Sequence, residues 1–287
     1  MGFNFNFKGF KDELAKHFSK KYVDENGNEQ KGLDEHHIVT EDLIRYWFKN
    51  IHESTNGMPY TEVPYIRLKG DESITPLQIK KDVPMLIPIV HKGGKESYRV
   101  RADLYYGDID SGDEQDEDKI DSVFEFKYHR RTRYSNCCTG TDCGSVFGDL
   151  NRLSILKNRE KYFVYVFDDN MYDEYYKNKT QELFKIFKNL SVNSNNPIFV
   201  NVGKNFDSVV FGNKFPNASK GFGEIKKGAF SQFKGNCKFA EFKYDIKVLY
   251  SSEICKVDVK EWGKRKSKTF YLLICQVLDN NSKQTEN

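Results

Sequence analysis

Two segments of the sequence could bring acids and a lysine into one site. In SYRVRADLYY (97–106), the alternation expected of a strand puts Asp103 on the face opposite the apolar residues. In DSVFEFKYH (121–129), the same alternation puts Glu125 and Lys127 on one face. Two carboxylates on neighbouring strands would make an oxygen-rich site for a hard cation such as Mg²⁺. The lysine could hold an attacking water or offset the charge of a phosphate.

The surrounding pattern predicts the elements that position these residues. A strand at 85–91 and the strand containing Asp103 flank KGGKE, which is typical of a hairpin loop. After the strand containing Glu125, residues 145–158 are predicted to form a helix capped by Ser145. The next strand, 161–167, is almost wholly apolar, as expected of a strand buried on both faces. This order indicates a parallel, right-handed connection.

A further helix is predicted before the strands. Thr40 can cap it, and apolar residues recur at helical spacing up to Glu53. Glu41 falls on the face that it shares with Ile44, Phe48 and His52. Earlier and later segments are predicted as a short helix at 11–21 and an extended, proline-containing stretch at 61–69.

The remainder of the chain is predicted to be rich in strands. A helix is expected at 172–190, which gives a boundary at about residue 190 between a core (1–190) and a β-rich extension with a polar tail (191–287). Strands are predicted at 197–202, 207–211, 239–250 and 268–278.

The ordered set of Asp103, Glu125-Phe126-Lys127, a helix and an apolar strand resembles the PD-(D/E)xK nuclease superfamily over about residues 40–169. The resemblance implies an α/β, restriction-endonuclease-like core with a mixed central sheet flanked by helices. It also implies Mg²⁺, with Mn²⁺ as a substitute, held by Asp103, Glu125 and the backbone carbonyl of Phe126. Lys127 would orient the water or the scissile phosphate. Ala102 stands where many members have proline.

The family often takes a further glutamate from the helix before the sheet. Glu41 matches that position best, with Glu53 and Glu62 as competitors. The helix after the motif often carries polar residues toward the site or the DNA, which implies such roles for Asn151 and Arg152.

The expected activity is that of a metal-dependent endonuclease acting on DNA, in restriction or antiphage defence, in the cytoplasm and as a homodimer. The stretch KYHRRTRY supports a nucleic-acid partner, since Arg130, Arg131 and Arg133 could grip the phosphate backbone. They could equally form a solvated loop. The alternative function is a non-catalytic nucleic-acid-binding or assembly protein that keeps the nuclease fold.

The tetrapeptide Glu-Phe-Lys-Tyr occurs a second time in the chain, which shows how specific the short motif is. Glu241-Phe242-Lys243-Tyr244 repeats the tetrapeptide of residues 125–128. No clear acid-bearing strand precedes this second copy, and no clear helix and buried strand follow it. It is therefore interpreted as half-exposed structure without chemistry.

Composition limits the class of protein. The chain has 287 residues and a net charge of +3, with no apolar run near the roughly 18 residues of a membrane span. The start shows no secretory signal, which agrees with a cytoplasmic protein. The segment 107–118 holds seven acids, and without it the chain has 45 basic and 35 acidic residues. That surplus suits a polyanionic partner. The acidic segment itself is either a solvated loop or a flap that repels nucleic acid.

Two further clusters have competing interpretations. Cys137, Cys138 and Cys143 could bind a structural metal, but their spacing lacks the paired pattern of zinc sites and favours a loop with reduced thiols. The basic run 260–268 is more typical of a solvated hairpin loop than of a nucleic-acid contact.

Overall fold

A computed structural model shows the chain as a mixed α/β protein. It describes residues 2–23, 26–31, 39–57, 59–64, 89–90, 96–97, 101–107, 121–130, 140–157, 159–173, 198–202, 225–235, 237, 241–261 and 264–279. The predicted helix 172–190, the predicted strand 207–211 and most of the acidic segment 107–118 lie outside these residues.

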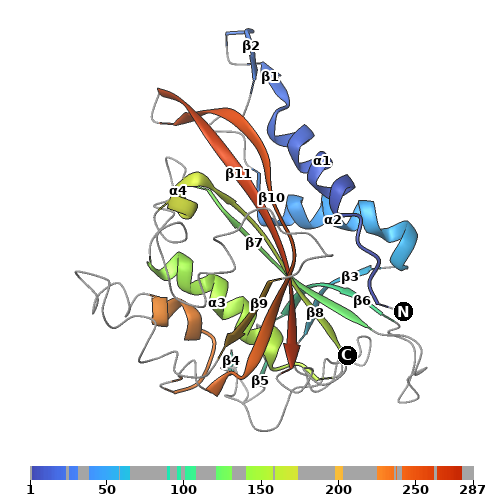
Figure 1. Cartoon of the computed structure of the whole chain (residues 1–287). Helices are drawn as coiled ribbons and strands as arrows, with labels where there is room; N and C mark the ends of the chain where they lie inside the picture. Colours follow the sequence, from blue (N-terminus) through green and yellow to red (C-terminus); the bar gives the residue numbers. More distant parts are fainter. Residues whose placement is uncertain are drawn as a thin grey trace.

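A seven-stranded mixed sheet forms the centre of the molecule (Figure 1). Its strand order is β3-β6-β7-β8-β11-β10-β9, and every neighbouring pair is antiparallel except β7 and β8. The parallel β7–β8 pair confirms the parallel pairing predicted from the apolar second strand. The strands are β3 (Pro59–Pro64), β6 (Arg101–Tyr106), β7 (Ser122–His129), β8 (Glu160–Asp168), β9 (Ile198–Val202), β10 (Tyr244–Glu261) and β11 (Lys264–Asp279).

Two short pairs of strands lie outside the main sheet. β1 (Lys21–Val23) pairs with β2 (Glu29–Lys31), and β4 (Ile89–Val90) pairs with β5 (Glu96–Ser97). The second pair is the hairpin predicted around KGGKE. The predicted strand 97–106 is therefore divided between β5 and β6.

Helices cover both faces of the sheet (Figure 1). α1 (Phe7–Phe18) and α2 (Glu41–Asn56) share one aromatic-rich core with Leu104, Phe124 and Phe126. α3 (Gly140–Ser154) and the helical segment 225–230 share a second core with residues of the opposite sheet face. Since alternate residues of a strand point to opposite faces, β7 contributes to both cores.

The helix boundaries follow local capping. Thr40 caps α2 as predicted, since its Oγ1 accepts the Leu43 N–H at 3.3 Å. α1 begins earlier than predicted because the Asn6 side chain accepts the Gly9 N–H. The predicted capping role of Ser145 is wrong. α3 already begins at Gly140, and the Ser145 hydroxyl donates to the Asp142 carbonyl within the helix.

The N-terminal segment is fastened across α2. Its Phe3 and Phe5 rings pack on Phe48 and Phe124, at centroid distances of 4.7 to 6.4 Å. The buried His52 accepts the Asn6 N–H at Nε2 and donates from Nδ1 to the Phe48 carbonyl. His52 is therefore a structural residue, and its burial lowers its pKa.

The predicted boundary near residue 190 crosses a continuous sheet. β11 pairs with β8 over seven positions, so the C-terminal strands extend the core sheet edge to edge. On the side of Phe270 toward the turn between β10 and β11, these two strands pair only with each other among the described strands. They run on past the sheet as a long hairpin beside α1 (Figure 1).

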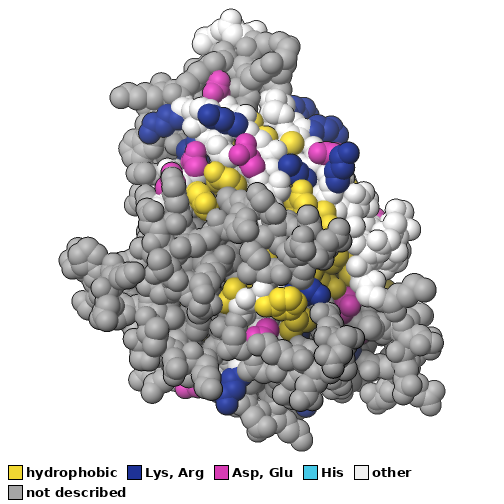
Figure 2. Space-filling view, viewed as in Figure 1, with side chains coloured by type: hydrophobic (Ala, Val, Ile, Leu, Met, Phe, Trp, Pro, Cys, Tyr) yellow, Lys and Arg dark blue, Asp and Glu magenta, His cyan; other side chains and the backbone are white. Residues whose placement is uncertain are grey.

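The basic run 260–268 lies at the tip of this hairpin. Within it, the side chain of Lys268 is buried and forms an ion pair with Asp168 at 2.7 Å. On the face in Figure 2, the described Lys and Arg side chains alternate with Asp and Glu. Among the described helices, none is both long and apolar enough to cross a bilayer.

Candidate active site

The candidate site forms where β6 and β7 stop pairing. Their paired register ends at Leu104↔Phe124, one residue before Asp103 and Glu125 would face each other. Beyond that point, the Phe126 N–H donates to Asp103 Oδ2 at 2.6 Å. The Tyr128 N–H donates to Glu41 Oε2 at 3.3 Å. Side-chain carboxylates thus replace the missing strand as acceptors for β7, because a half-buried backbone N–H needs a partner.

Lys127 lies between acids contributed by two helices. Its Nζ is 3.0 Å from Asp149 Oδ2 of α3 and 3.5 Å from Glu41 Oε2 of α2. Burial alone would lower the pKa of this lysine, but the Asp149 and Glu41 carboxylates outweigh it and raise the pKa above its ordinary value. Lys127 is therefore a fixed positive charge at neutral pH, not a proton acceptor.

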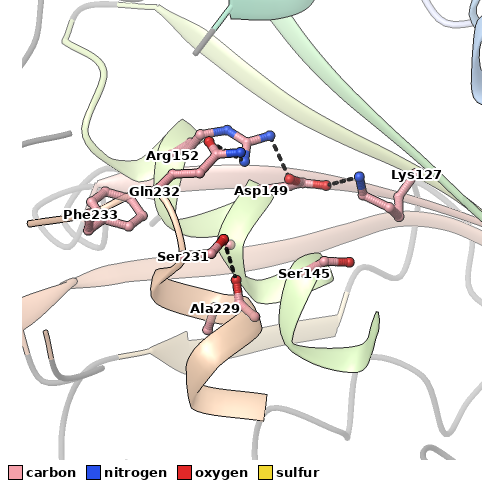
Figure 3. A pocket seen from close by; sticks show the side chains of 10 residues that line it. Lys127, Ser145, Asp149, Arg152, Ala229, Ser231, Gln232 and Phe233 are labelled. Carbon is pink, nitrogen blue, oxygen red and sulfur yellow. Dashed lines mark hydrogen bonds and ion pairs between the residues drawn. The ribbon is translucent and has the colours of Figure 1, made fainter. Parts of the chain in front are cut away.

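Glu125 is held by Arg152 of α3. The glutamate side chain is 1 % exposed, and its Oε2 accepts from Arg152 Nη2 at 2.9 Å. The same nitrogen is 2.5 Å from Asp149 Oδ1, and Nη1 donates to Gln232 Oε1 at 3.0 Å. Figure 3 shows Asp149 between Lys127 and Arg152. Asp149 therefore joins both charged residues of the Glu-Phe-Lys motif into one network.

The carboxyl group of Asp103 has a strongly perturbed pKa. Burial, reinforced by the Glu41 carboxylate, raises its pKa from 3.8 to about 7, although the Phe126 N–H opposes the change. Burial also raises the pKa of Glu41. Among the described residues, four carboxylates lie in this cluster with three basic residues, Lys127, Arg152 and Arg45, so the acids outnumber the bases by one. Its acids are Glu41, Asp103, Glu125 and Asp149.

Arg45 of α2 braces Asp103 from the outer side. Its Nη1 donates to the Asp103 carbonyl at 3.1 Å and lies 3.6 Å from the Asp103 carboxylate. The same group binds Glu62 Oε1 at 2.7 Å. Glu62 has a φ of 59°, a strained value for a non-glycine residue in a strand. Of the two competitors for Glu41, Glu62 thus reaches the cluster through Arg45, whereas Glu53 is exposed near the other end of α2.

The residues predicted to bind a metal ion carry suitable donor atoms, but they are not arranged as a metal site in this structure. In the described part of the chain, no group of three or more His, Cys, Asp or Glu side chains is arranged to hold a metal ion. Asp103 and Glu125 supply oxygen donors of the kind that Mg²⁺ prefers. In this structure, however, Glu125 is already engaged by Arg152.

A small polar cavity of about 110 Å³ adjoins Lys127 (Figure 3). Its opposite wall is the segment 228–233, which approaches α3 at two glycines. A Cβ on Gly144 would lie 2.1 Å from the Ile225 carbonyl oxygen, and one on Gly148 would lie 3.2 Å from that of Gly228. At Gly144 only glycine lets the two backbones come this close, whereas at Gly148 a Cβ would need the neighbouring backbone to shift by a few tenths of an ångström. The approach brings Gln232 to Arg152.

The residues predicted to contact nucleic acid are less accessible than expected. Arg130 and Arg152 are 5 % and 9 % exposed, and Asn151 is fully buried. The Asn151 amide accepts from the Tyr244 hydroxyl at 2.9 Å and donates weakly to the Ala229 carbonyl. Asn151 thus fastens the segment 225–230 to α3 in this structure. Arg131 and Arg133 lie outside the described residues.

Sequence reasoning did not identify Asp149, Arg45 and Gln232. Asp149 could have been found from helix periodicity, because it lies three residues before Arg152 and four after Ser145, on one face of α3. Nothing in the local sequence around Gln232 points to the site.

Of the three cysteines considered as metal ligands, the structure describes only Cys143. Cys143 belongs to α3 and is buried in the core, whereas Cys137 and Cys138 lie outside the described residues. His129, a conceivable partner, is buried against the Tyr165 hydroxyl at 2.8 Å. Its burial, with the nearby Lys127, lowers its pKa to about 4.

Comparison of the chain with protein-family models, with curated proteins and with solved structures gives no match.

Proposed function

We propose that the chain is a Mg²⁺-dependent phosphodiester hydrolase that acts on DNA. The observation that carries the proposal is the convergence of Asp103, Glu125 and Lys127 with Glu41 where β6 and β7 diverge. These are the residues singled out by the resemblance to PD-(D/E)xK nucleases. Restriction or antiphage defence remains the expected setting by analogy with that family.

The donor set agrees with a divalent cation in chemistry and in charge. Asp103, Glu125 and the Phe126 carbonyl would hold the ion, with Glu41 completing its shell directly or through a water. Burial, reinforced by the Glu41 carboxylate, raises the pKa of Asp103, and a cation bound at this carboxylate would oppose both effects. A bound cation would lower the pKa of a water and stabilise charge on the phosphate.

The roles of the chain's own residues follow from their contacts. Lys127 stays protonated and is aimed by Asp149 and Glu41, so it orients an attacking water or the scissile phosphate by charge and position. Arg45 fixes the backbone of Asp103 and thereby the direction of its carboxylate. By their place in the sequence, Arg131 and Arg133, which lie outside the described residues, would contact the phosphate backbone of the substrate, whereas Arg130 is buried.

A cleavage assay with matched variants tests the proposal. Wild type, Lys127→Ala and Lys243→Ala would be incubated with supercoiled plasmid, linear duplex and RNA, each with Mg²⁺, Mn²⁺ or EDTA. We expect metal-dependent products from wild type and from Lys243→Ala. Lys127→Ala should lose about 100-fold or more, the scale of removing one transition-state contact. Undiminished cleavage by Lys127→Ala would exclude the site.

One observation favours the second candidate function, a nucleic-acid-binding or assembly protein without catalysis. Glu125 is already paired with Arg152 and almost completely buried. Such a protein would bind DNA with an affinity that falls steeply with salt, but would leave it uncut under every metal condition.

A further inference from the structure

Arg152 and a divalent cation would compete for the same carboxylate. Arg152 Nη2 donates to Glu125 Oε2 at 2.9 Å, and the Glu125 side chain is almost completely buried. Charge-assisted hydrogen bonds of this kind are among the strong ones. A cation bound at Oε2 of Glu125 would therefore compete with Arg152 for this contact.

Arg152 has two other anchors that do not depend on Glu125. Nη2 lies 2.5 Å from Asp149 Oδ1, and Nη1 donates to Gln232 Oε1 at 3.0 Å. Gln232 is carried by the segment that meets α3 at Gly144 and Gly148. The guanidinium would thus keep a charged and a neutral acceptor after leaving Glu125, and its buried charge would stay compensated.

We propose that Arg152 is a positioning residue that sets the cation affinity of Glu125. Without the cation, Arg152 balances the Glu125 charge; with the cation bound, it rests on Asp149 and Gln232. Gln232 thus supports the site from the C-terminal part of the chain without touching the cation. This inference rests on the proposed function, because it takes Glu125 as a cation ligand.

Titration calorimetry with Mn²⁺ alone, in the absence of nucleic acid, tests the inference on the full chain. Arg152→Gln frees Glu125, so Mn²⁺ should bind about tenfold more tightly, the effect of losing one competing charge-assisted bond. Gln232→Leu removes an anchor that Arg152 has both with and without the cation, so the Mn²⁺ affinity should change by less than about twofold. Thermal denaturation of each variant would show that it is folded.

Two further variants separate this inference from simpler alternatives. Arg152→Lys keeps the charge but cannot reach three partners in the same fork geometry, so we expect an affinity different from wild type. If Arg152→Gln binds Mn²⁺ no more tightly than wild type does, Arg152 does not compete with the cation and the inference is wrong. If wild type binds no Mn²⁺, or Glu125→Gln binds it equally well, Glu125 is not a ligand and the proposed function fails as well.

Discussion

The tetrapeptide Glu-Phe-Lys-Tyr occurs twice, and the two copies have opposite arrangements of charge. In the copy at 125–128, Glu125 is buried and Lys127 lies between two acids. In the copy at 241–244, Glu241 and Lys243 are both exposed, just before β10 begins. The aromatic ring between them is buried in both copies, whereas the surrounding elements decide whether the charged side chains are buried and paired or exposed.

The difference comes from the element that faces each copy. The copy in β7 lies under α3, which supplies Asp149 and Arg152. The second copy faces the segment 225–235, where Phe242 packs on Phe230 and Phe233 at 5.6 and 4.9 Å. A charged strand face becomes a site only when complementary charges cover it.

The two copies are nevertheless connected through one segment. Phe230 and Phe233, which pack on Phe242, flank Gln232, and Gln232 binds Arg152. The second copy thus contributes to the candidate site through its phenylalanine. This comparison gives four predictions, in order of decreasing effect.

Replacing Phe242 should have the largest effect on stability. Phe242→Ala removes a buried ring from the core, which lowers the free energy of unfolding by about 3 to 5 kcal/mol. Urea denaturation would measure the change. Phe242→Leu, which keeps most of the volume, should lose much less. An unchanged midpoint for Phe242→Ala would show that the second copy does not support the segment 225–235.

Removing the glutamate should distinguish the two copies most clearly. Glu125→Ala leaves the buried Arg152 without one partner, so we expect a loss of about 3 kcal/mol. Glu241→Ala at an exposed position should change stability by no more than about 0.5 kcal/mol. Equal losses in parallel urea titrations would contradict the contrast drawn between the copies.

The protonation of Asp103 should make stability depend on pH. Because its folded pKa is raised from 3.8 to about 7, the fold favours the neutral acid. The stabilisation is complete below about pH 4 and is lost progressively as the pH rises to about 7. Asp103→Asn should therefore raise the Tm at pH 8 in EDTA, on the order of 5 °C. Its advantage should vanish near pH 4, and an advantage that grew at low pH would refute the assignment.

The smallest effect is expected where the sequence looks most like the site. The double variant Glu241→Ala/Lys243→Ala should keep the wild-type Tm within about 2 °C, because both side chains are exposed. Its Mn²⁺ affinity should also be unchanged. A loss of Mn²⁺ binding would move the candidate site to the second copy.

Several features could be predicted from sequence because they depend on near neighbours. Period-two alternation identified the faces of β7, Thr40 identified the start of α2, and the apolar run identified β8 as a central strand. In β6 the alternation fails at Ala102, which lies in the other core from Leu104 and Tyr106. The start of α3 and the continuity of the sheet across residue 190 were not predicted. They depend on packing between segments that lie far apart in the chain.

The sequence by itself determined which residues are chemically able to act: Asp103, Glu125, Lys127 and Glu41. Only the tertiary structure decided how they are paired. Arg152 and Asp149 reach the motif because α3 crosses β7, and Gln232 reaches Arg152 because two glycines let a distant segment approach α3. The physical reason is that side-chain type and alternation are local properties. The partner of a buried charge is set by long-range packing, which also sets its pKa.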